Sequence, residues 1–168
     1  MKYTLYLLTC FTSIVIFLCS FKNAIISADS FTKGDDKYTI GMKAFGGVIF
    51  HLDKTKKHGL VVSTENIGGS WMTYSWGCYG LSIEDAEGID VGTGRLNTNA
   101  ILNACDEKET AAYACVNYEH EGFSDWFLPS LEELELIAEN LAYDDEFSDV
   151  IQFDNANYLS STQLKNKK

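Results

Sequence analysis

Aromatic side chains stand beside amide and hydroxyl groups most densely between residues 64 and 96. Trp71 and Tyr74 follow Asn66 within a glycine-rich stretch that has no helix or strand periodicity. Proteins commonly hold small polar ligands against aromatic faces flanked by a few hydrogen-bonding groups. These three residues are therefore candidate ligand-binding residues. The alternative is that the aromatic rings form the core of a loop-rich domain, the interpretation we favour for Trp76 and Trp126.

Asp125 is the fourth candidate, in the segment Ser124-Asp125-Trp126-Phe127-Leu128-Pro129. We interpret it first as a buried carboxylate that fixes the turn before Pro129 through hydrogen bonds. A direct role in ligand binding is the second interpretation.

Nucleophilic catalysis needs a serine or cysteine beside a histidine and a third, orienting group. The histidines are His51, His58 and His120, and no nucleophile-elbow or protease-like sequence surrounds a serine or cysteine. We therefore predict no catalytic residues and a non-enzymatic protein. The rival hypothesis is an enzyme that uses Cys78 as a reactive thiol or an acidic pair.

Acidic residues are dense near the C-terminus, but they lack the regular spacing and fixed glycine of a calcium loop. We interpret them as a solvated acidic turn and predict neither a metal site nor a cofactor. They are Asp144, Asp145, Glu146, Asp149 and Asp154.

The N-terminus has the layout of a secretion signal: Lys2 is followed by an uncharged run from Tyr3 to Cys19. We assign residues 1–28 to a signal peptide, 29–36 to a linker and 37–168 to one domain. The protein is then exported to the periplasm, the cell surface or the medium. An uncleaved signal anchor is the alternative and would be the chain's membrane attachment.

The chain has a formal net charge of −11. This balance argues against a nucleic-acid or anionic-membrane partner, because such partners require clustered Lys and Arg. A glycan or another cell-surface molecule remains as the expected partner, and the oligomeric state stays open.

Three cysteines follow the signal, and an oxidising compartment favours one disulfide among them. We predict that Cys105 pairs with Cys115 across a break between two short helices, which leaves Cys78 as the free thiol.

Three short β-branched and aromatic runs predict strands at 37–40, 47–52 and 59–63, and a fourth strand is expected at 158–162. Helices are expected at 100–105 and 110–119. Ser130 and Glu133 form a capping box ahead of a third helix at 131–142, whose apolar face includes Leu134. The order of elements predicts an α+β fold with a short antiparallel sheet, two to three helices and a long loop region.

Several of these segments together resemble the Lcl C-terminal domain family, named for a collagen-like bacterial surface adhesin. The resemblance covers about residues 40 to 163 and is most specific at Asp125–Ser130 with the capped helix. It implies a fold related to C-type-lectin-like and formylglycine-generating-enzyme domains, and a lectin-like binding function. The segments that carry it are 45–50, 58–62, 76–78, 92–94 with 97–99, 122–130 with 133–134, and 159–162.

Two departures from the family pattern bear on these expectations. The active-site cysteine pair of formylglycine-generating enzymes lies toward the C-terminus, and no cysteine here follows Cys115. Family members also continue into further strands after the Ser-Ser-Thr segment at 160–162. We therefore expect an incomplete domain in which the strands near Ile49 and Tyr158 are more exposed than their character warrants. A truncated structural fragment without a ligand is the remaining alternative.

Overall fold

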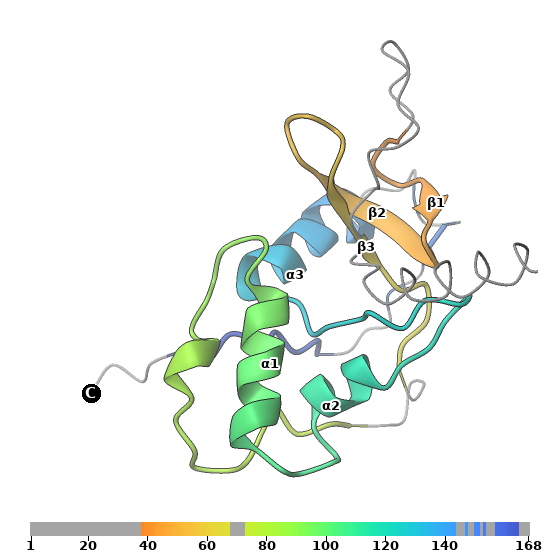
Figure 1. Cartoon of the computed structure of the whole chain (residues 1–168). Helices are drawn as coiled ribbons and strands as arrows, with labels where there is room; N and C mark the ends of the chain where they lie inside the picture. The colour runs from red at the N-terminus through yellow and green to blue at the C-terminus, as the bar shows by residue number, and fades with distance from the viewer. Residues whose placement is uncertain are drawn as a thin grey trace, which may run out of the picture.

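The computed structural model describes residues 38–67, 73–143, 147, 150–151, 153 and 157–164 (Figure 1). The predicted signal peptide, the linker and Trp71 lie outside these residues. The described part is α+β, with one three-stranded antiparallel sheet and three α-helices. Within it, no helix combines the length and the apolar character needed to cross a bilayer.

The sheet runs in the order β1-β2-β3, from strands β1 (Lys43–Ala44), β2 (Gly47–Leu52) and β3 (Gly59–Val62). The predicted strands at 47–52 and 59–63 are therefore confirmed. Residues 38–40, the described part of the expected first strand, are not in a strand. The expectation of an exposed Ile49 is wrong: its side chain is 1% exposed. Val48 and Ile49 point to opposite faces of the central strand and both are buried, so both faces are covered.

The segment Tyr158–Thr162, expected to be a strand, has no strand partner in the described structure. Its backbone instead bonds to two loops. Ser161 N–H donates to the Pro129 carbonyl at 2.7 Å, and Gln163 N–H donates to the Ala86 carbonyl at 2.7 Å. Tyr158 is exposed, as expected. The segment bonds to loops that are distant in sequence, an arrangement that its local sequence does not encode.

The helices are α1 (Gly94–Ala104), α2 (Ala111–Val116) and α3 (Leu131–Ile137), with a 3-10 turn η2 (Glu84–Ala86) and a π turn η3 (Ala138–Ala142). The prediction for α1 began six residues too late because it used Asn97 and Thr98 as caps. Both are instead buried inside the helix. Asn97 exchanges hydrogen bonds with Gly88, and Thr98 donates to Gly94 and Leu128 carbonyls.

The capped helix was predicted correctly, and α3 with η3 spans its full expected length. Figure 1 shows α3 beside the sheet. Its apolar face covers β2, because Ile137 and Leu141 are buried in one cluster with Val48 and Phe50. Leu134, by contrast, is only half-buried. A second core lies between η2 and the first two helices, from Ile83, Ala86, Ile101 and Ala112.

Glu133 is the third residue of α3, and its side chain is completely buried. One carboxylate oxygen accepts the N–H of Ser130 at 2.8 Å and completes the capping box. The other accepts the N–H of Gly92 at 2.8 Å, from the loop that leads into α1. We call Gly92, Ser130 and Glu133 the carboxylate junction. It fixes the starts of α1 and α3 against each other.

Hydroxyl groups extend this junction to the C-terminal segment. Ser130 Oγ donates to the Asp90 carbonyl at 3.1 Å. Thr162 Oγ1 accepts the N–H of Leu131 at 3.0 Å and donates to the Gly88 carbonyl at 2.7 Å. The backbone also passes so close to Glu133 that a Cβ on Gly94 would overlap the carboxylate. Three separate segments are therefore held together by polar contacts rather than by a shared sheet.

The predicted disulfide is wrong: Cys78 pairs with Cys105, and Cys115 is the free, buried cysteine. The bridge between Ser75 and Thr110 brings the loop that contains Cys78 close to the connection between α1 and α2, where Cys105 lies. The Cα atoms of Cys78 and Cys105 are then 5.5 Å apart, within disulfide range. Cys115 lies on α2 and packs into the core beside Ala111 and Leu128.

We predict that Glu133→Gln lowers the free energy of unfolding by about 1 to 3 kcal/mol, because an amide NH2 would replace one of two acceptors that face backbone N–H groups. Glu132→Gln is the matched control. Glu132 is exposed on the same turn, and its substitution should change stability by less than about 0.5 kcal/mol. Urea unfolding of both variants measures the difference. Equal effects would show that the buried carboxylate is not a structural acceptor.

We predict that non-reducing peptide mapping finds a Cys78–Cys105 peptide pair. Burial raises the pKa of the Cys115 thiol to about 12, and the thiolate is the reactive form. The peptide that contains Cys115 should therefore resist alkylation in the native protein and react after unfolding. Fast native alkylation at Cys115, or its appearance in the disulfide, would contradict the structure.

Candidate functional site

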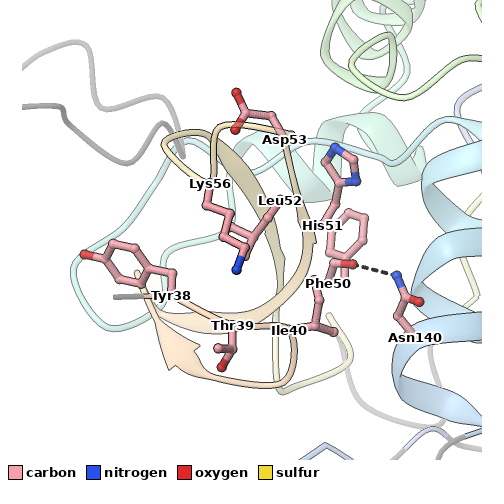
Figure 2. Close-up of a pocket in the computed structure, with 9 residues that line it drawn as sticks. All are labelled: Tyr38, Thr39, Ile40, Phe50, His51, Leu52, Asp53, Lys56 and Asn140. Carbon is pink, nitrogen blue, oxygen red and sulfur yellow. Dashed lines mark hydrogen bonds between the residues drawn. The ribbon is translucent and has the colours of Figure 1, made fainter. Parts of the chain in front are cut away.

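An open pocket of about 400 Å³ lies at one end of the sheet (Figure 2). It is bordered by the chain that enters β1, the end of β2, the turn that follows β2, and η3. The turn supplies charged groups, and the floor supplies apolar side chains. The lining residues are Tyr38, Thr39, Ile40, Phe50, His51, Leu52, Asp53, Lys56 and Asn140.

Two backbone irregularities meet at this pocket. The β2–β3 pairing shifts register between Ile49 and His51, which places a bulge at Phe50. Asn140, in the π turn, donates its Nδ2 hydrogen to the Phe50 carbonyl at 2.9 Å (Figure 2). Bulged strands and π turns both occur preferentially at functional sites. The contact ties the pocket to the helix that packs under the sheet.

Asp53 organises the turn between β2 and β3. Its Oδ1 atom accepts the N–H groups of Thr55 at 3.0 Å and Lys57 at 3.2 Å, and the Thr55 hydroxyl bonds to the carboxylate at 2.8 Å. The Thr55 side chain is the main cause that lowers the pKa of Asp53 below its usual value, with help from backbone N–H groups. The carboxylate therefore stays charged and holds the shape of the turn.

Lys56 occupies the left-handed backbone region, with φ of 55°. Its N–H donates to the Asp53 carbonyl at 2.9 Å, which closes the turn. Figure 2 shows its side chain directed from the turn into the space bordered by Tyr38, Thr39 and Phe50. The turn thus places an ammonium group at the pocket.

Three of the four candidate residues from the sequence, Asn66, Tyr74 and Asp125, do not line this pocket. Tyr74 is half-buried and packs against the cluster of Ala111, Cys115 and Leu128. Asn66 is exposed, and Trp71, its predicted neighbour in a ligand site, lies outside the described residues. Tyr74 therefore contributes to a small core, in line with the alternative interpretation of the aromatic residues.

Asp125 has a structural partner in α1. Its carboxylate lies 3.4 Å from Arg95 Nη2, which also donates to the Asp125 carbonyl at 2.9 Å. The Arg95 guanidinium sits 4.8 Å from the centre of the Phe127 ring. Asp125 therefore has a hydrogen-bonding partner, as its first interpretation requires. Its side chain is a quarter exposed, however, and not buried as we expected.

Both described tryptophans use their indole N–H within the protein. Trp76 donates to the Ser160 carbonyl at 2.9 Å and Trp126 to the Phe123 carbonyl at 3.0 Å. Both side chains are half-buried. Their interpretation as packing residues agrees with these contacts.

The rival hypothesis of a reactive Cys78 is wrong, because that sulfur is in the disulfide. Cys78, Cys105 and Glu107 place one potential metal-ligand atom each within 4.8 Å of the others. Both sulfur atoms are consumed by the bond between them, so the cluster offers no thiolate. The remaining thiol, at Cys115, is buried with a pKa near 12.

Sequence reasoning missed the pocket because its lining comes from three separated segments, 38–40, 50–56 and Asn140. None of them carries a motif, and neither the bulge nor the π turn has a sequence signature here. The concentration of lysines at positions 54–57 was the available signal. Comparisons with protein-family models, curated proteins and solved structures found no match to this chain.

We predict that Thr55→Val raises the pKa of Asp53 toward its ordinary value, because the hydroxyl donor is lost while the shape of the side chain is kept. The folded-state pKa is depressed, so the stabilisation from these bonds is present above the unfolded-state pKa and is lost as pH falls through the folded-state pKa. NMR titration of the carboxyl carbon measures the shift. Thr73→Val, at another exposed loop position, should leave it unchanged. A pKa of Asp53 unaffected by Thr55→Val would contradict the described turn.

Proposed function

We propose that this chain is an exported, non-enzymatic binding domain with a lectin-like fold that recognises a glycan through the pocket of Figure 2. The observation that carries the proposal is the composition of this pocket. Aromatic rings, hydroxyl groups, an imidazole, an amide and the charged side chains of Asp53 and Lys56 surround an apolar floor. Such a mixture suits a ligand that has both apolar faces and many hydroxyl groups.

The position of the pocket supports a binding role. It is built on the central strand of the sheet, and the bond from Asn140 to the Phe50 carbonyl anchors its wall. Tyr38 contributes a ring that packs 5.6 Å, centre to centre, from Phe45, the residue after β1. Binding sites commonly combine a rigid scaffold with an adjoining loop in this way.

The proposed membership of the Lcl C-terminal domain family, with its C-type-lectin-like fold, is supported by architecture of the same kind. The described chain has a small sheet, short helices and long ordered connections. The segment Trp126–Ser130 ends in the capping box whose glutamate is buried. In this proposal the segment Trp126–Ser130 stabilises the fold, and the ligand binds at the pocket beside the sheet.

A non-enzymatic role is supported by the state of the cysteines. Covalent catalysis by a thiol requires an accessible thiolate. In the described residues, two cysteines form the disulfide and the third is buried and protonated at neutral pH.

We predict that the full chain binds a subset of a glycan array, and that Tyr38→Ala weakens this binding by tenfold or more through the loss of a ring at the pocket. Tyr79→Ala is the matched control, because Tyr79 is fully exposed and outside the pocket. Arrays are read with and without calcium.

A second variant, Trp71→Ala, tests the candidate ligand-binding residue that the sequence analysis proposed. Loss of binding with Trp71→Ala, but not with Tyr38→Ala, would move the site away from the pocket. Absence of any glycan signal would overturn the proposed function.

A further inference from the structure

We infer that this chain forms a weak dimer in which β3 pairs antiparallel with β3 of a second copy, across a two-fold axis at Val61. The inference goes beyond the proposed function and does not depend on it. It rests on three observations. The outer edge of β3 carries unused backbone hydrogen-bonding groups, the strand lacks the features that protect sheet edges, and the charges that flank it are complementary to those of a second copy.

The backbone of β3 directs the polar groups of two residues away from the sheet. β3 is an edge strand, because the order of strands is β1-β2-β3. Ile49 of β2 uses its N–H and its carbonyl on the β1 side, where they bond to Met42 and Gly41. Its register partner Val61 therefore points its own N–H and carbonyl away from β2, and Gly59 does so two residues earlier. No described residue bonds to these groups.

β3 lacks the features that commonly protect a sheet edge from pairing, which are shortness, lysine, proline or a bulge in the edge strand. The other edge, β1, is protected in this way, because it has only two residues and one of them is Lys43. β3 has four residues, Gly59–Val62, with no charged residue or proline among them. The bulge of the hairpin lies on β2, at Phe50. The outer edge of β3 is therefore open to another strand.

The two-fold axis fixes which residues of the two copies face each other. With the axis at Val61, this residue exchanges both of its backbone hydrogen bonds with the partner's Val61. Gly59 pairs in the same way with the partner's Ser63, which directly follows β3 in the sequence. An axis at Leu60 or Val62 is excluded, because the backbone groups of these residues face β2. The pairing joins two three-stranded sheets into one continuous sheet.

The same register brings opposite charges together at both ends of the paired strands. Two residues beyond the pair of Gly59 and Ser63, Lys57 lies opposite the partner's Glu65. Lys57 is exposed and has no ion pair with another described residue. The Glu65 side chain is 67% exposed, and its carboxylate lies 3.9 Å from His120 Nδ1. Because the axis repeats the contact, a second copy matches this edge in charge as well as in hydrogen bonding.

The contact is small, so the dimer is weak. Residues 57–65 of each copy supply it, compared with roughly 20 to 30 residues per partner in a stable complex. We expect a dissociation constant on the order of 0.1 mM. Each copy carries its pocket beside the turn between β2 and β3, so the dimer presents two pockets. A ligand with repeated units can engage both pockets and gain affinity from their linkage.

The test is sedimentation equilibrium of the full chain from about 10 μM to about 1 mM, at about 0.15 M salt. The unsubstituted chain should pass from monomer to dimer over this range. Lys57→Glu and Glu65→Lys each place like charges at both ends of the contact, and each should raise the dissociation constant about tenfold or more. An equimolar mixture of these two variants again pairs opposite charges at both ends and should restore the dimer.

Lys54→Glu is the matched control. It changes the net charge by the same amount, on the same exposed turn, but lies outside residues 57–65, so it should change the dissociation constant by less than about threefold. An equal effect of Lys54→Glu would show general repulsion between acidic chains and overturn the role of Lys57. A chain that stays monomeric at about 1 mM, or a mixture that associates no better than its two components, would overturn the inference.

Cross-linking tests where the contact lies. Val61→Cys places a thiol at the axis, where a short bis-maleimide should link two copies of the full chain. Leu96→Cys, at an exposed position of α1, is the matched control, and the native thiol of Cys115 is buried. The link should form with Val61→Cys and decrease when Lys57→Glu is added. Equal linking of both cysteine variants, or no link from Val61→Cys, would overturn the two-fold contact at β3.

Discussion

The buried carboxylate of Glu133 is the constraint on which the rest of this fold depends. Burial of a charged group is costly unless hydrogen bonds replace its water. Here each oxygen accepts a backbone N–H, one from Ser130 and one from Gly92. Because these two donors belong to different loops, the satisfied carboxylate requires the loops to be adjacent. The adjacency in turn sets where α1 and α3 begin.

Helix α3 and the π turn η3 connect the buried carboxylate to the pocket. Ser130 and Glu133 fix the start of α3, and Asn140 lies ten residues after Ser130, or roughly 15 Å along a helix. The Asn140 amide then holds the bulged carbonyl of Phe50 on the central strand. The junction and the pocket are therefore the two ends of one rigid element. The junction stabilises the fold, and the proposed function places ligand binding at the pocket.

The parts of the fold that were predictable from the sequence depend on neighbouring residues. The capping box, the length of the third helix and the β2–β3 hairpin are encoded by spacing within about a dozen residues. Asn97 and Thr98 misled the prediction of α1 because they have the residue types of caps but bond to backbone outside the helix, at Gly88 and at Leu128. The disulfide prediction was wrong because the pairing depends on a tertiary contact. The β-bridge between Ser75 and Thr110 brings Cys78 and Cys105 close together.

The candidate site was harder to predict than the fold. Its lining residues are ordinary in type, and the bulge and π turn that shape it arise from tertiary contacts. The net charge of −11 argues against nucleic-acid and anionic-membrane partners, and that expectation stays a prediction.

Native-state hydrogen exchange measures the central claim most directly, because it reports each backbone N–H separately. If the Glu133 carboxylate organises the fold, the amide protons of Gly92 and Ser130 exchange only through global unfolding, as slowly as that of Ile49 in the central strand. The amide of Lys57 in the exposed turn exchanges faster. Exchange of Gly92 and Ser130 at the rate of Lys57 would show that the junction opens independently, and would contradict its role as the constraint on which the fold depends.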